Sequence, residues 1–144
     1  LVDLFGAFPL GASFHALVPQ RLLDTRGGYP LFGATPRTQQ VAGLGGVPGS
    51  PLPSGAVLTL TLLNPAGPGW ATIYPCATGQ PNTSMLNVVS NREQTNAVIP
   101  AIDGAGTVCL YSSTTSHVLV DVSGWSGAAF LPLTPARLLD TRIG

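Results

Sequence analysis

The sequence repeats part of its beginning near its end. The hexapeptide Arg-Leu-Leu-Asp-Thr-Arg at residues 21–26 recurs without change at residues 137–142, and Leu-Val-Asp at residues 1–3 recurs at residues 119–121. Six identical residues in the same order do not arise by chance in a chain of this length. Because a single domain needs each of its elements once, the sequence indicates one unit of a tandem array of bead-like domains, together with parts of its neighbours.

The repeated segments divide the chain into three parts. We predict that residues 19–127 form one complete repeat and that residues 128–144 contain a linker and the start of the next repeat. Residues 1–18 contain a linker and a second copy of the strand expected to close the domain. That strand either ends the preceding repeat or is donated to the open sheet edge of a neighbouring subunit. The sequence leaves covalent tandem joining and strand exchange both open.

Charged residues are few and concentrate in the repeated segments. Only 8% of the residues are charged, the net charge is zero, and every basic residue is an arginine. Such a chain has no electrostatic field to gather nucleic acid, and its apolar runs are too short to insert into a membrane. We therefore predict neither of these partners. Weak net repulsion favours self-association, so the expected partners are neighbouring repeats or subunits.

The repeated hexapeptide has the composition of an ion-paired junction. In an extended strand Asp24 shares a face with Arg26, so we expect an arginine to clamp the carboxylate. A planar guanidinium forms such a pair with two hydrogen bonds. We predict ion pairs that fix a strand end or a domain or subunit junction, and a ligand-binding Arg–Asp pair is the alternative. The residues concerned are Arg21, Asp24, Arg26 and their copies Arg137, Asp140 and Arg142.

Turn residues interrupt the rest of the chain and indicate an all-β fold. The chain holds 18 glycines and 14 prolines, too many for long helices. Residues 57–62 alternate aliphatic residues with threonine, as in a half-buried strand. We predict an antiparallel β-sandwich of jelly-roll type, with a long Gly/Pro-rich loop within residues 27–55. Further strands are predicted at residues 1–5, 14–18, 21–25, 38–42, 70–76, 84–89, 95–100, 107–112 and 117–123.

The two cysteines, Cys76 and Cys109, lie in separate strand-like segments. A disulfide between them is the interpretation that we favour. It would stabilise the fold by roughly 3–4 kcal/mol through the loop that it closes, and it would place the protein in an oxidising compartment. The alternative is a pair of buried thiols in a cytosolic protein.

Residues that could carry out catalysis are sparse. The two histidines, His15 and His117, occur singly and without the spacing of a zinc site, and Glu93 is the only glutamate. No nucleophile motif or phosphate-binding motif is present. We therefore predict a non-enzymatic domain without cofactor or metal. A hydrolase that uses Asp24 or Asp140 is the weakest alternative.

Four aromatic residues suggest a binding role. Trp70, Tyr74, Tyr111 and Trp125 could form a platform on which sugar rings stack, as in binding modules built on β-scaffolds. Packing in the core is the stronger explanation for these side chains.

Five motifs follow one another along the chain: Pro-x-Arg-Leu-Leu-Asp-Thr-Arg, Tyr-Pro-Cys, Met-Leu-Asn, Val-Cys-Leu-Tyr and Val-Asp-Val-Ser-Gly-Trp, at residues 19–26, 74–76, 85–87, 108–111 and 120–125. Together they resemble one known family, the repeat domains of large secreted proteins of actinobacteria and related high-GC bacteria. The resemblance implies an extracellular or cell-surface domain with a disulfide between Cys76 and Cys109. The chain departs from the family at residues 58–64, where a leucine-rich strand replaces the more usual Asn-Val-Thr.

These observations predict a structural repeat domain of an extracellular fibre, filament or cell-surface array that assembles head to tail. The repeated segments, the low charge and the expected disulfide favour this hypothesis. The alternative is a carbohydrate-binding or cell-wall-anchoring accessory module of a secreted hydrolase, with cell-wall polysaccharide as its partner. The aromatic residues favour this second hypothesis.

Overall fold

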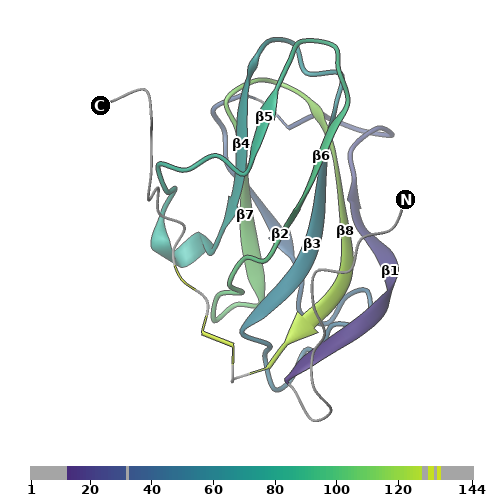
Figure 1. The fold of residues 1–144 in the computed structure, drawn as a ribbon, viewed down its shortest axis with the longest axis vertical. Helices are drawn as coiled ribbons and strands as arrows, with labels where there is room; N and C mark the ends of the chain where they lie inside the picture. Colours follow the sequence, from purple (N-terminus) through teal and green to yellow (C-terminus); the bar gives the residue numbers. More distant parts are fainter. Residues whose placement is uncertain (1–12, 32, 128–129, 132, 134–144) are drawn as a thin grey trace, which may run out of the picture.

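The computed structural model shows a two-layer, all-β domain (Figure 1) and describes residues 13–31, 33–127, 130, 131 and 133. Two antiparallel sheets of four strands form a sandwich, which confirms the predicted fold class. The first sheet contains, in spatial order, β1 (Phe14–Asp24), β8 (His117–Ser126), β3 (Gly55–Leu63) and β6 (Gln94–Val98). The second contains β2 (Arg37–Gln40), β7 (Thr107–Ser112), β4 (Gly69–Tyr74) and β5 (Leu86–Val88).

The strand pairing follows a jelly-roll topology. The first strand pairs with the last, β2 pairs with β7, β3 with β6 and β4 with β5. The chain is thus a long ribbon of paired strands, wound so that successive pairs fall in alternate sheets. This winding makes neighbours of the two repeated segments, because residues 21–24 on β1 pair with residues 119–121 on β8.

Alternating side chains fill the space between the sheets. On β3, Leu58, Leu60 and Leu62 are buried, as the alternation of this segment predicts. The same cluster contains three valines of β8 and, from the second sheet, Ile73 and Leu110. Full burial of one such aliphatic side chain contributes about 1.5–3 kcal/mol. The core between the sheets is therefore the main source of stability.

β1 is one long edge strand where the sequence predicts two short ones. It runs without a break over residues 14–24, with irregular pairing to β8 between Ala16 and Gln20. Pro19 lies within this irregularity. Because proline has no N–H to donate, it is tolerated on an edge strand at such a site. The strand also begins upstream of residue 19, the predicted start of the complete repeat.

The Gly/Pro-rich segment at residues 27–55 covers part of the core and contains one short strand, β2, before β3 begins. Val47 of this segment is buried. Gly45 has a φ of 58°, and a Cβ there would lie 2.7 Å from the side chain of Val122 and 2.9 Å from that of Leu22. Only glycine tolerates both the backbone conformation and the close approach. The loop therefore packs directly against β1 and β8.

A disulfide joins Cys76, in the short 3-10 turn η1 (Cys76–Thr78), to Cys109 on β7, which confirms the predicted pair. The bond ties the chain just after β4 to the neighbouring strand. Because disulfides persist in oxidising compartments, it indicates an environment outside the reducing cytoplasm. In the part of the chain that the structure describes, no helix has the length and apolar character needed to cross a membrane.

Candidate functional site

The first copy of the hexapeptide lies on β1 and forms ion pairs with β8. The register places Arg21 opposite Asp121. The guanidinium of Arg21 donates to both carboxylate oxygens of Asp121, through Nε to Oδ1 and through Nη2 to Oδ2. Asp121 belongs to the other repeated segment, residues 119–121. The two repeated segments therefore bind each other within one unit.

Asp24 connects this pair to Arg26. Its carboxylate accepts hydrogen bonds from Nη2 of Arg26 at 2.6 Å, from the backbone N–H of Arg26 at 3.0 Å and from Nη1 of Arg21 at 3.2 Å. The hydrogen bonds of the Arg26 side chain, and next that of its backbone, hold the pKa of Asp24 well below its usual value. The structure thus brings together the Asp24 and Arg26 side chains that the extended hexapeptide places on one face.

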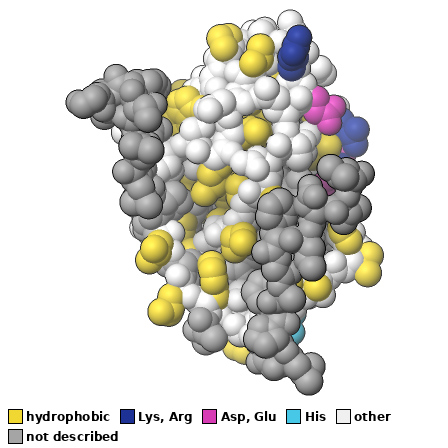
Figure 2. Space-filling model, in the orientation of Figure 1, with side chains coloured by type: hydrophobic (Ala, Val, Ile, Leu, Met, Phe, Trp, Pro, Cys, Tyr) yellow, Lys and Arg dark blue, Asp and Glu magenta, His cyan; other side chains and the backbone are white. Residues whose placement is uncertain are grey.

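This network lies at the surface. It contributes more to the register between β1 and β8 than to the stability of the fold. The side chains of Arg21 and Arg26 are 40% and 59% exposed, and exposed ion pairs contribute about 0–1 kcal/mol each. A slip of β1 by one residue would turn Arg21 away from Asp121. On the face drawn in Figure 2, the charged side chains gather at one side of the domain and apolar side chains are spread over the rest.

The remaining residues of the first hexapeptide anchor β1 to the core. Leu23 is buried, and Leu22 packs against the same cluster. Thr25 is buried; its hydroxyl accepts a hydrogen bond from the N–H of Val118 at 2.8 Å, and its carbonyl oxygen lies 2.9 Å from Nδ1 of His117. Each residue of this copy therefore has a defined partner inside its own unit.

Sequence reasoning missed Asp121 as the partner of Arg21. The signal was present, because Asp121 and its copy Asp3 both belong to repeated segments, but no local pattern shows which distant strands pair. The structure does not describe the second copies of the ion-pair residues. Arg137, Asp140 and Arg142 lie outside the described residues, as does the predicted strand at residues 1–5.

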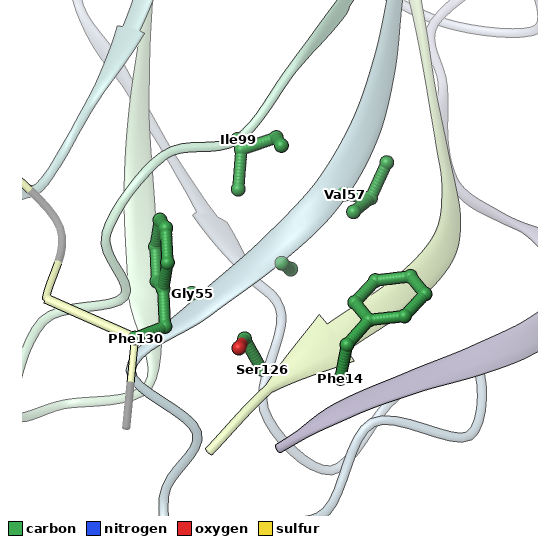
Figure 3. A pocket seen from close by; sticks show the side chains of 7 residues that line it. Phe14, Gly55, Val57, Ile99, Ser126 and Phe130 are labelled. Atoms are coloured by element: carbon green, nitrogen blue, oxygen red, sulfur yellow. The ribbon is translucent and has the colours of Figure 1, made fainter. Parts of the chain in front are cut away.

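An apolar pocket of about 320 Å³ opens at one end of the first sheet. β1 starts here with Phe14 and β3 starts with Gly55, and both residues are register partners of Ser126, where β8 ends. Phe130 lines the side opposite Phe14, with Val57 and Ile99 beyond them (Figure 3). Sequence reasoning did not foresee this pocket.

The two phenylalanines of the pocket each lie on a glycine. A Cβ on Gly124 would be 2.6 Å from Cζ of Phe14, and a Cβ on Gly55 would be 2.8 Å from Cε1 of Phe130. Glycine therefore permits the approach of both rings. Phe14 and Phe130 also precede their copies of the hexapeptide by the same number of residues. They are corresponding residues of the two copies of this repeated segment, a signal that the sequence contains.

The aromatic residues considered for sugar binding lie on two different sheets. Trp70 of β4 is half-buried, and its ring lies 5.0 Å from that of Tyr111 on β7 at a tilt of 41°. Tyr74 on the same strand is buried, and this burial raises the pKa of its hydroxyl. Trp125 of β8 stacks on His15 at 3.9 Å in the first sheet. Of the four aromatic residues, the structure therefore brings together Trp70 and Tyr111 on the second sheet, and the four do not share one surface.

Among the residues that the structure describes, no three His, Cys, Asp or Glu side chains form a group that could hold a metal ion. Comparison of the chain with models of known protein families and with curated proteins finds no match.

Proposed function

We propose that this domain is a structural repeat of an extracellular fibre, filament or cell-surface array, in which copies follow one another head to tail. The observation that carries the proposal is the duplication of both members of one strand pair. β1 and β8 pair with each other in the first sheet, and the sequence contains a second copy of part of each. A domain that acts alone gains nothing from such second copies, whereas an array requires them.

Surface properties support an assembling domain outside the cytoplasm. The net charge is zero, so copies repel one another only weakly. Several large apolar side chains are exposed, among them Val18 at 80%, Leu131 at 81% and Leu133 at 84%. Neighbouring copies are partners that would cover such side chains. The disulfide is suited to an extracellular location.

The carboxylates of the ion-pair network support a structural role. Asp24 accepts hydrogen bonds from both arginines of its hexapeptide, and its lowered pKa makes it a poor general base. Asp121 is held at both oxygens by Arg21. In this proposal the domain is non-enzymatic and uses no cofactor.

Self-association of the purified chain can be measured by light scattering and sedimentation velocity over a wide concentration range. We expect the average mass to rise with concentration and to fall when residues 1–8 are deleted, because the deletion removes the piece of the preceding copy. A chain in which residues 1–8 are scrambled, with composition and length unchanged, is the control and should behave like the deletion. A strict monomer at every concentration would contradict self-association and would leave only covalent joining of copies.

A carbohydrate-binding, wall-anchoring module is the second candidate, and the Trp70–Tyr111 pair is the observation that favours it. Both rings are half-buried and lie on neighbouring strands of the second sheet. Sugar rings stack on aromatic surfaces of this kind. Retention on peptidoglycan, chitin or cellulose that Trp70→Ala abolishes and Trp125→Ala preserves would support this function. Absence of retention on all three polymers would contradict it.

A further inference from the structure

We propose that the pocket end of the domain is the surface through which successive copies join, and that its partner is the pocket end of a second copy of this chain. The pocket end comprises the start of β1, the end of β8, the start of β3 and the residues that line the pocket between them. The inference rests on the array proposed above and names the surface that builds it. The first hexapeptide does not serve as this joint, because its side chains are engaged within their own unit.

The beginning and the end of one unit lie side by side at this pocket. Phe14, the first residue of β1, is the register partner of Ser126, the last residue of β8. Only residues 127–129 separate Ser126 from Phe130, which corresponds to Phe14 in the next copy. A connection of this length spans at most about 14 Å. A following copy must therefore start beside the pocket of the copy before it, at the end of the first sheet where β1 begins (Figure 1).

One phenylalanine ring serves both copies at each junction. Phe130 lies against Gly55 of this unit, whereas its counterpart Phe14 lies against Gly124 of the same unit. In the following copy, the ring of Phe130 takes the position of Phe14 and is expected over the glycine equivalent to Gly124. The same ring then lines the pocket of one copy and the pocket of the next. Successive pocket ends must therefore lie next to each other for one ring to reach both.

The chemistry of the pocket fits an apolar partner. Among the described residues, Ser126 is the only polar side chain in the lining, and no charged side chain lines the pocket. Ile99 is 55% exposed there, so a second copy would remove apolar surface from water. The short connection raises the effective concentration of one pocket end next to the other, so a modest apolar contact is sufficient in an array.

Cysteine trapping on the full chain tests this contact. Ile99→Cys places a thiol at the joint in both copies, and mild oxidation should yield disulfide-linked dimers whose fraction rises with protein concentration. Val89, which follows β5 in the second sheet and is 51% exposed, is the matched control. We expect Val89→Cys to yield at least about tenfold less dimer, since random collision alone forms it. Mass spectrometry checks that Cys76 and Cys109 stay paired.

Charged substitutions at the same two positions give the converse measurement. Ile99→Asp places a carboxylate without a partner in an apolar contact, so the concentration for half-assembly should rise at least about tenfold. Val89→Asp should leave this concentration unchanged. Comparable melting temperatures of the two variants show that neither effect comes from unfolding.

The outcomes separate this inference from the array itself. If the wild-type chain assembles, Ile99→Asp assembles equally well and Ile99→Cys forms no dimers, the pocket is not the joint, although the array proposal stands. If the wild-type chain remains monomeric and Ile99→Cys forms no dimers, self-association itself fails, and the inference fails with it. If a monomeric chain binds 8-anilinonaphthalene-1-sulfonate and Ile99→Asp abolishes this binding, the pocket is a site for a small apolar ligand, which overturns the inference.

Discussion

Asp24 is the residue at which the ion-pair network depends most directly on pH. Its pKa lies well below the usual value, chiefly because the Arg26 side chain donates hydrogen bonds to its carboxylate. A carboxyl group whose pKa is lower in the folded state stabilises the fold above its unfolded pKa of about 3.9, and this stabilisation is lost as the pH falls. We expect Asp24→Asn to lower the melting temperature at neutral pH and to flatten its decline between about pH 5 and pH 2. Circular dichroism melts would contradict this if the two chains gave parallel pH curves.

Gly124 is the residue that allows β1 to begin where it does. A Cβ there would lie 2.6 Å from Cζ of Phe14 and 3.1 Å from the backbone oxygen of His15. Gly124→Ala must therefore displace the ring, and we expect the free energy of unfolding to fall by about 1–3 kcal/mol in urea titrations. Gly104→Ala is the control, because a Cβ on Gly104 meets no atom within 4 Å. An equal effect of both substitutions would show that the Phe14 contact is not the cause.

The disulfide is the strongest constraint on any single element, since it fixes η1 against β7. Its two cysteines are separated by 33 residues, and closing a loop of this size reduces the entropy of the unfolded chain. We expect Cys76→Ser combined with Cys109→Ser to lower the free energy of unfolding by about 3–4 kcal/mol. Guanidinium titrations measure the effect, and reduction of the wild-type chain should reproduce it. An unchanged midpoint in both experiments would contradict it.

The elements could be predicted wherever one sequence pattern decides them. The threonine–leucine alternation of β3 and the bounds of β7 at residues 107–112 are evident from the sequence. The sequence predicts two strands in place of β1 because Pro19 interrupts the pattern. The strand continues through Pro19 only because β1 lies at the edge of the sheet. The pocket could not be predicted from the sequence, for a different reason. It depends on Phe130 lying against Gly55, a residue far from it in the sequence, and no local pattern encodes such a contact.

The topology of the whole molecule explains why the repeated segments come from opposite ends of the unit. In a jelly roll the first strand pairs with the last. The strands at the two ends of the unit therefore form one strand pair. The same winding places Phe14 and Ser126 opposite each other. In the array proposed above, a piece of the neighbouring copy on either side of the unit would therefore belong to the same strand pair, and this is the pattern that the sequence repeats.

This topology also means that β1 can be supplied from either side of the unit, before β2 or after β8. Residues 130–142 repeat Phe14 and the whole hexapeptide in their correct spacing. Residues 127–129 are as long as a common hairpin loop, about 2–5 residues. A chain that lacks residues 1–26 should therefore still unfold cooperatively, with residues 130–142 paired to β8 in place of β1. A chain that also lacks residues 130–144 should not unfold cooperatively, because β8 and the core lose the strand that covers them.

Arg137 provides the control for this replacement. In the shortened chain Arg137 takes the position of Arg21 opposite Asp121, so Arg137→Asp would place two carboxylates against each other and lower the melting temperature. In the full chain Arg21 already holds Asp121 at both oxygens, so the same substitution should have no effect on the melting temperature. Equal melting temperatures with and without Arg137→Asp in the shortened chain would show that residues 130–142 do not replace β1, even if that chain folds. The comparison thus tests whether the repeated hexapeptide retains, in its second copy, the pairing that defines the first.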